Sequence, residues 1–330
     1  MSGSVALTLG DPAGIGGEIA LKAWAALAGE IPFFLIGDAG QMADLAGGLG
    51  IPLRRIAAPA EATAALPHGL PVLHHPLPRR GAPGRPEPEN AAAVVEIIAR
   101  GAALAREGAA LALCTNPINK KALKEGAGFA FPGHTEFLAS LAGAPLAVMM
   151  LAAPALRVVP VTIHIPLRHV PDALSPDLLA ATLRITHEAL RRDFGLPVPR
   201  IAVAGLNPHA GEGGAMGDEE TRVIAPVLDR LRGEGIQITG PHSADTLFHA
   251  AARAGYDVAV CMYHDQALIP LKTLDFDGGV NVTLGLDFVR TSPDHGTAYD
   301  IAGLGRANPS SLVAALSLAH DLGLRRAGQQ

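Results

Sequence analysis

Short apolar runs alternate along this chain with longer segments whose apolar residues recur at helical spacing, and this alternation constrains the fold most. Apolar runs occur at 5–9, 33–36 and 110–114, and helical periodicity occurs at 17–28 and 89–107. Strands that alternate with helices favour an α/β fold with a largely parallel sheet. The first half of the chain is therefore expected to form βα units.

The second half continues the alternation with one exception. Two β-rich runs at 147–151 and 156–165 lie too close together for a crossover helix, so we expect an antiparallel hairpin there. The remaining expected elements are strands at 201–204, 258–262 and 280–283 and helices at 176–194, 218–232, 245–254 and 310–321. No linker stands out, and the domain boundaries are weakly marked.

The composition supports a large core and excludes two classes of partner. Hydrophobic residues make up 49% of the 330 residues, and a chain of this length corresponds to two domains at roughly 150 residues each. Lysine and arginine number 26 against 31 acidic residues, for a net charge of -5. Nucleic-acid binders usually carry a basic excess, and anionic membranes attract one. We therefore expect neither a nucleic-acid nor a membrane partner.

Three features predict a cytoplasmic location. The longest apolar stretch, about 146–156, is interrupted by Pro154 and is shorter than the roughly 20 residues of a spanning helix. Residues 1–11 lack the pattern of a signal peptide. Cys114 and Cys261, the only cysteines, are far apart, which is typical of a reduced chain. Their apolar surroundings predict buried, structural thiols.

Three histidines follow three separate predicted strands. His164 ends the run at 156–165, His209 follows 201–204, and His264 follows 258–262. Ligands in open α/β sheets bind beyond the carboxyl ends of strands, and neutral imidazole is the commonest metal ligand. Three imidazoles leave coordination positions for a substrate. The alternative is three unrelated polar side chains, because no local spacing such as His-x-x-x-His supports a metal motif.

Two further clusters carry groups that suit an anion. Lys272, Asn281 and Arg290 span a glycine-rich segment; arginine can bind phosphate or carboxylate through two parallel hydrogen bonds, and lysine acts as a point charge. A solvated surface charge is the alternative for Lys272. In the PGHTE segment at 132–136, Thr135 is a candidate helix cap with His134 facing a ligand, and capping alone is the alternative.

The glycine-rich turn at 10–16 comes directly after the first strand and precedes a helix. Such a turn can present free N–H groups to an anion, but its spacing is not that of the dinucleotide fingerprint. A plain strand-to-helix turn is the alternative. The chain has no Gly-x-Ser-x-Gly elbow and no Walker-type loop, so nucleophilic catalysis by serine and P-loop phosphate binding are poor explanations.

Seven strings of the sequence together are specific. They are TLGDPAGIG at 8–16, PGHTE at 132–136, NPHAGEG at 207–213, ADTLF at 244–248, MYHDQ at 262–266, NVTLGL at 281–286 and RTSPDHGT at 290–297. With them the chain resembles the 4-hydroxythreonine-4-phosphate dehydrogenase (PdxA) family of pyridoxal phosphate biosynthesis, which is related to the isocitrate and isopropylmalate dehydrogenases. The resemblance extends over nearly the whole chain.

The resemblance implies an architecture and an assembly. It implies two α/β/α domains with a cleft between them, as in isocitrate and isopropylmalate dehydrogenases, and a homodimer with shared active sites. We place the first domain at 1–130 with 300–330 and the second at 131–299, the latter carrying the metal ligands and the dimer contacts.

The resemblance also implies roles for single residues. One divalent metal ion per site, which could be Zn, Mg, Co or Mn, would be bound by His164, His209 and His264 contributed across the dimer. The substrate would be bound by His134, Thr135, Lys272, Asn281 and Arg290.

The expected reaction is the metal-dependent oxidation of 4-phosphooxy-L-threonine with NAD or NADP, followed by decarboxylation to 3-amino-2-oxopropyl phosphate. Asp245 and Lys120 are both candidates for the general base that removes the hydroxyl proton. Related dehydrogenases of threonate or erythronate 4-phosphate, or of an aromatic cis-diol carboxylate, stay open as alternatives. So do a non-catalytic cleft-type binding protein, a phosphate acyltransferase and a metal hydrolase.

Overall fold

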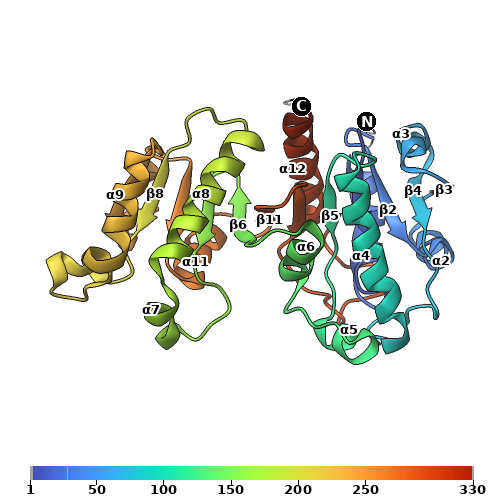
Figure 1. Ribbon diagram of the computed structural model, residues 1–330. Helices are drawn as coiled ribbons and strands as arrows, with labels where there is room; N and C mark the ends of the chain where they lie inside the picture. Colours follow the sequence, from blue (N-terminus) through green and yellow to red (C-terminus); the bar gives the residue numbers. More distant parts are fainter. Residues whose placement is uncertain (1–2, 28, 329–330) are drawn as a thin grey trace. The chain divides into compact units, whose positions relative to one another are not determined.

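The computed structural model describes residues 3–27 and 29–328 and divides the chain into two compact units (Figure 1). Unit 1 comprises Met1–Ala147 with Leu286–Gln330, and unit 2 comprises Val148–Gly285. These bounds place 131–147 and 286–299 in unit 1, where we expected the second domain. The reason is local packing: helix α6 (His134–Ala142) contacts α4 (Ala91–Arg106), and strand β12 (Arg290–Pro293) pairs with β5 (Leu113–Thr115).

Unit 1 contains a parallel sheet with the strand order β3-β4-β2-β1-β5-β12. The four strands not yet introduced are β1 (Val5–Thr8), β2 (Phe33–Gly37), β3 (Leu53–Ile56) and β4 (Leu70–His74). Every residue of β1 and β2 is buried, so helices cover both faces of the sheet, as the unbroken apolar runs predict. The expected strands at 5–9 and 33–36 are therefore confirmed.

The helices of unit 1 pack around this sheet. Helix α4 lies against β1, β2 and β5, while α12 (Ser310–Ala327) contacts β12, β5 and α1 (Gly16–Leu27). One hydrophobic core joins Ala6, Phe34 and Leu113 of the strands to Val94 and Ile97 of α4. The other helical segments of unit 1 are α2 (Ala39–Leu49), η1 (Pro59–Glu61), α3 (Ala62–Ala65), η2 (Leu66–His68), η3 (Pro88–Asn90) and α5 (Lys120–Ala127). Ala28, the last residue of the helix expected at 17–28, lies outside the described residues.

Unit 2 contains a mixed sheet with the strand order β11-β6-β7-β10-β8-β9. Its strands are β6 (Val148–Ala153), β7 (Leu156–Pro160), β8 (Ile201–Ala204), β9 (Ile238–His242), β10 (Val258–Cys261) and β11 (Val280–Leu284). Strands β6 and β7 pair antiparallel, which confirms the predicted hairpin. Strands β7, β10, β8 and β9 are parallel neighbours.

Helices cover the sheet of unit 2 as well. Helix α8 (Pro176–Arg192) contacts β6 and β11, α9 (Ala225–Gly233) contacts β9, and α11 (His264–Leu274) contacts β7 and β10. The prediction of one helix at 245–254 is wrong, because two short segments form there instead: η7 (Ala244–Thr246) and α10 (Ala250–Arg253). The other helical segments are η4 (Leu167–His169), α7 (Val170–Ala173), η5 (Pro208–Gly214) and the π-helical turn η6 (Glu220–Ile224).

Two expectations about the chain as a whole can be checked. None of the helices in the described residues is long and apolar enough to cross a membrane. Cys114 and Cys261 are free and buried, which confirms the prediction of structural thiols. Burial raises the pKa of the Cys114 thiol to about 12 and raises that of Cys261 further, so neither is a nucleophile at neutral pH.

Candidate functional site

Four neighbouring parallel strands of unit 2 end at one edge of the sheet, and each is followed by one of the predicted site residues. His164 follows β7, His264 follows β10, His209 follows β8 and Asp245 follows β9. The carboxyl ends of adjacent parallel strands form the usual ligand-binding edge of an α/β sheet. The prediction that these histidines lie just beyond strand ends is therefore confirmed for all three.

Two of the three imidazoles come together within the chain. The ring centroids of His164 and His264 are 5.7 Å apart, and both residues line a pocket of about 260 Å³. Asp265 Oδ1 lies 2.7 Å from His264 Nδ1. If the carboxylate accepts the Nδ1 proton, the lone pair of Nε2 is left for a ligand, an arrangement typical of metal-binding histidines.

His209 does not complete this pair within one chain. Among residues 3–27 and 29–328, no group of three or more His, Cys, Asp or Glu side chains could hold a metal ion. The donor chemistry of His164 and His264 suits Zn²⁺ or Co²⁺, so the chain fits such an ion as part of a site. A third ligand for such an ion would have to come from outside this pair.

Asp245 lies close to His209 but makes its own hydrogen bond. Ser243 Oγ donates to Asp245 Oδ1 over 2.6 Å. This hydrogen bond lowers the pKa of the Asp245 carboxyl, and the charge of His209 lowers it further. Asp245 is therefore an exposed carboxylate that is ionised at neutral pH, beside one of the proposed metal ligands.

Lys272 and Asn281 are also in unit 2. Lys272 is in the last turn of α11, whereas His264 begins the same helix; eight residues of helix place their backbones about 12 Å apart along its axis. The Lys272 ammonium lies 5.5 Å from the ring centroid of Phe276. Asn281 is in β11, and its Oδ1 is buried with no hydrogen-bond partner among the described residues. Lys272 is thus not adjacent to the histidine pair of its own chain.

In unit 1, Arg290 is a buried cation. It is the first residue of β12, is 3% exposed, and its Nη2 donates to Thr115 Oγ1 over 2.6 Å. Burial lowers the pKa of its guanidinium to about 10, so it keeps its charge at neutral pH. A guanidinium fixed in this way suits a phosphate or carboxylate.

His134 lies near Arg290 and Lys120. Burial, followed by the positive charges of Arg290 and Lys120, lowers the pKa of His134 well below 6.5, so the ring is neutral. Its Nε2 is buried with no hydrogen-bond partner in the described part of the chain. A Cβ atom on Gly133 would lie 3.5 Å from Lys120 Nζ, so the glycine leaves room for the amine. Three predicted residues, His134, Lys120 and Arg290, therefore share one environment.

Thr135 does not cap the helix. Helix α6 begins at His134 with Gly133 at the N-cap position, and no side chain makes a capping hydrogen bond there. The capping alternative is therefore wrong, and Thr135 remains a candidate ligand-binding hydroxyl in the first turn.

Two features of this region were not predicted. The carboxylate of Glu136 raises the pKa of Arg290, which places it near the guanidinium; its position in the PGHTE segment was the only available signal. In the second feature, the Tyr299 hydroxyl donates to Asp11 Oδ2 over 2.6 Å and accepts from Asn119 Nδ2 over 2.8 Å. Asn119 caps α5, so this chain of bonds fixes the helix that begins with Lys120.

The glycine-rich turn at 10–16 is packed against the protein's own chain. A Cβ atom on Gly10 would lie 2.5 Å from the Pro117 carbonyl oxygen, and one on Gly14 would lie 2.9 Å from that of Thr297. Glycine is needed here for close packing. This close packing explains why glycine occupies these two positions of the strand-to-helix turn.

Comparisons with known proteins agree over the full length. Residues 30–319 match the family described as pyridoxal phosphate biosynthetic protein PdxA. A 4-hydroxythreonine-4-phosphate dehydrogenase from Paracoccus denitrificans (strain Pd 1222) is 58% identical over 98% of both chains. A crystal structure of the enzyme with the same name from Klebsiella pneumoniae has 42% identity and a TM-score of 0.88, covering 97% of this chain and 99% of its own.

A more distant solved structure concerns the choice of substrate. A terephthalate 1,2-cis-dihydrodiol dehydrogenase from Burkholderia xenovorans LB400 is 30% identical with a TM-score of 0.68, covering 96% of this chain and 97% of its own. The similarity is therefore higher to the dehydrogenases named for the phosphorylated hydroxythreonine.

Proposed function

The chain belongs to the family of pyridoxal phosphate biosynthetic protein PdxA, and on this premise we propose that it oxidises 4-phosphooxy-L-threonine in pyridoxal phosphate biosynthesis. As a member it is a dehydrogenase, an oxidoreductase that acts on a hydroxyl group. The single observation that carries the proposal is the 58% identity, over 98% of both chains, to an enzyme named 4-hydroxythreonine-4-phosphate dehydrogenase.

The proposed reaction has two steps. The secondary alcohol loses a proton from oxygen and a hydride from carbon to NAD or NADP, which yields 2-amino-3-oxo-4-phosphooxybutanoate. This β-keto acid then loses carbon dioxide, because the ketone accepts the electron pair of the broken bond, and protonation gives 3-amino-2-oxopropyl phosphate.

The proposed metal ligands are His164, His209 and His264. A divalent ion bound by them would supply Lewis-acid stabilisation of the substrate oxygen, and Zn, Co, Mg and Mn are the candidates. Asp265 supports this role because its contact with His264 Nδ1 orients the ring.

We assign proton removal to Asp245 in preference to Lys120. Asp245 is an ionised carboxylate beside His209, so it can accept the hydroxyl proton. Lys120 lies with Arg290 around His134, where its ammonium is suited to attract an anion. Asp245→Asn is expected to abolish the basic group and remove the acid limb from the pH profile of kcat/KM, whereas Lys120→Ala should keep that limb.

The substrate's anionic groups are assigned to five residues: His134, Thr135 and Arg290 of unit 1, and Lys272 and Asn281 of unit 2. The buried guanidinium of Arg290 and the buried, unpartnered atoms of His134 and Asn281 support this assignment. A neutral His134 can donate one hydrogen bond to a phosphate oxygen without adding charge.

A homodimer with shared sites completes the proposal. In the described part of one chain, two imidazoles come together and no group of three candidate ligands forms. Unit 2 also exposes large apolar side chains: Ile165, Leu167, Ile269, Leu274 and Phe276. Exposed apolar side chains of this size are available for burial in a contact with a second copy. With both thiols unpaired, the cytoplasm is the proposed location.

The test is a substrate panel with both nicotinamide forms and a chosen divalent metal. We expect reduced nicotinamide to appear fastest with 4-phosphooxy-L-threonine. Faster oxidation of threonate or erythronate 4-phosphate, or of a cis-dihydrodiol carboxylate, would move the substrate assignment to those acids. Full turnover after chelator treatment and metal removal would contradict the metal mechanism.

A further inference from the structure

The backbone around His209 has a conformation that its side chains disfavour. His209, Ala210 and Glu212 have φ angles of 52°, 52° and 43°, and Gly211 and Gly213 are also positive. A non-glycine residue in this region costs about 1–2 kcal/mol. Strain of this kind persists only where the surroundings hold it, and it is concentrated at functional sites.

Glu220 holds the backbone before this turn, while its neighbour Glu219 accepts from Asn207 Nδ2 over 2.6 Å. Glu220 is 3% exposed, its Oε1 accepts from the backbone N–H groups of Leu206 and Asn207 over 2.7 and 2.8 Å, and its Oε2 accepts from Asn207 Nδ2 over 3.0 Å. Two glycines leave room for this carboxylate. A Cβ atom added to Gly205 would lie 3.0 Å from Glu220 Oε1, and one added to Gly211 would lie 2.6 Å from Glu220 Oε2. The carboxylate therefore binds the chain directly before the left-handed turn.

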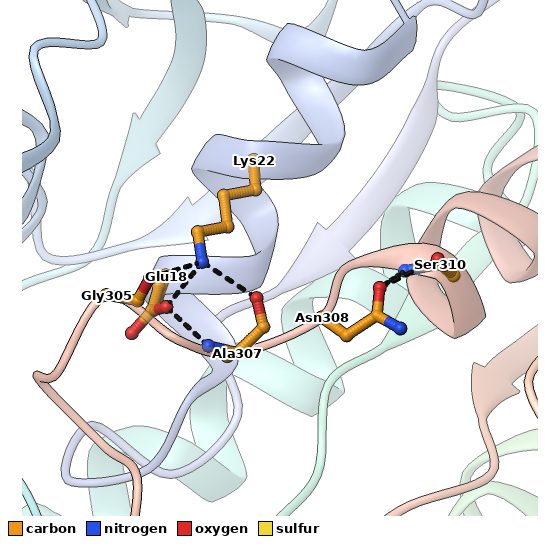
Figure 2. A network of polar contacts seen from close by, with 6 residues as sticks. All are labelled: Glu18, Lys22, Gly305, Ala307, Asn308 and Ser310. Atoms are coloured by element: carbon orange, nitrogen blue, oxygen red, sulfur yellow. Dashed lines mark hydrogen bonds and ion pairs between the residues drawn. The ribbon is translucent and has the colours of Figure 1, made fainter.

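Glu18, a second buried glutamate, makes contacts that only join parts of the fold, and it therefore serves as a comparison for Glu220. Glu18 in unit 1 is also 3% exposed, but Lys22 Nζ lies 2.8 Å from its Oε1 and the Ala307 N–H also donates to it (Figure 2). Lys22 also donates to the Gly305 and Ala307 carbonyls, so this group joins the segment before α12 to α1. The recorded contacts of Glu220, in contrast, are N–H groups two or three residues before His209.

The start of the following helix is also irregular. Glu220 is the first residue of a π-helical turn, a local widening that often occurs at functional sites. This π turn contacts η5, the segment that contains His209. The carboxylate of Glu220, the two glycines and the π turn are therefore all next to the left-handed turn.

We propose that Glu220 is a positioning residue, which clamps the backbone at 206–207 and so sets the direction in which the His209 imidazole leaves the left-handed turn. The inference rests on the proposed function, in which His209 binds the metal ion. Glu220 touches neither metal nor substrate in this role; it acts through His209.

The test measures Co²⁺ binding to the purified, metal-stripped protein by calorimetry, with turnover recorded beside it. Glu220→Gln keeps one oxygen for the two backbone N–H groups but turns an N–H group toward the amide nitrogen of Asn207. We expect Kd for Co²⁺ to rise roughly 10–100-fold, the usual effect of losing such a supporting contact. Turnover should recover as Co²⁺ is increased, because the ligand is still present, whereas His209→Ala should not recover.

Glu18→Gln is the matched control. It removes a buried carboxylate of equal exposure, so it should lower Tm without changing Kd for Co²⁺. Hydrogen exchange of the Leu206 and Asn207 amides provides a readout without metal: both should exchange faster in Glu220→Gln than in the wild type. Glu220→Ala should give the larger change in both quantities if it folds, and Glu220→Gln decides the question alone if it does not.

The outcomes distinguish a failure of the positioning role of Glu220 from a failure of the proposed metal site. Unchanged Co²⁺ affinity in Glu220→Gln, or an equal loss in Glu18→Gln, would overturn the positioning role. Failure of the wild-type protein to bind Co²⁺, or a normal Kd in His209→Ala, would instead overturn the proposed metal site.

Discussion

The predicted site residues of unit 1 lie close together within one chain, whereas those of unit 2 do not form a complete group of metal ligands in the described residues. In unit 1, Arg290 is buried and hydrogen-bonded to Thr115. Burial, together with the charges of Arg290 and Lys120, lowers the pKa of His134 and keeps its ring neutral. In unit 2, His164, His209 and Asp245 are exposed at the sheet edge, and the described residues contain no three-ligand group. One chain thus gathers Arg290, Lys120 and His134 in one environment, whereas the metal site that we propose would need a ligand from a second copy.

The largest expected effect is in unit 2. His264→Ala, or equally His164→Ala, removes one proposed metal ligand. Metal ions contribute several kcal/mol to such reactions, so turnover should fall by about 10³-fold or more. The rate of nicotinamide reduction and the bound metal, measured by elemental analysis, check this. Normal metal content and turnover in both variants would place the metal elsewhere.

The next effect is in unit 1 and concerns KM. Arg290→Lys keeps a charge but loses the planar donor pair, which is not a conservative change. Weakening a buried charged contact of this kind costs about 2 kcal/mol, so KM for the phosphorylated substrate should rise roughly 30-fold. Metal affinity should stay unchanged, because Arg290 and the histidines belong to different units. A parallel loss of metal would show that the two regions are not independent.

A smaller rise in KM is expected for Lys272→Ala. A hydrogen bond to a charged group contributes about 1.5 kcal/mol, which corresponds to roughly tenfold in KM. Lys121→Ala is the matched control, because Lys121 is an exposed lysine of α5 whose recorded ion pair is with Glu125 at 3.9 Å. Equal kinetics of Lys272→Ala and the wild type would show that Lys272 is a solvated surface charge.

The smallest effect is on stability and depends on pH. The pKa of His134 is lowered in the folded state, so the unfolded chain takes up a proton below about pH 6.5 that the folded protein does not. The contribution of His134 to the free energy of unfolding is therefore fully present above pH 6.5. It decreases as the pH falls below this value, by about 1 kcal/mol over one pH unit. Urea unfolding of the wild type and His134→Asn at pH 7.5 and 5.5 measures it. A constant difference between the two proteins would contradict the lowered pKa.

The buried strands could be predicted because burial on both faces leaves an uninterrupted apolar run. Strands such as β1 and β10, together with the β6–β7 hairpin, follow that rule. The positions of the three histidines follow from it as well, because each comes shortly after such a run.

The elements that escaped prediction lack this signal. The edge strand β3 reads LRRI and exposes both arginines, and β12 reads RTSP although all four residues are buried. The sequence places Arg290 only in a glycine-rich segment, whereas pairing with β5 places it inside unit 1. The backbone before the left-handed turn at His209 is bound by Glu220, eleven positions beyond His209 in the chain, and no local pattern of residues predicts such a contact.

Mixing two inactive variants tests most directly whether the proposed metal site of unit 2 is shared between two copies of the chain. His209→Ala and His264→Ala chains are unfolded together, refolded in equal amounts and assayed with metal, nicotinamide and substrate. If a site takes these two ligands from different copies, half of the dimers regain one intact site, and roughly a quarter of wild-type activity returns. Activity that stays at the level of either variant alone, with mixed dimers demonstrated, would contradict a metal site shared between two copies.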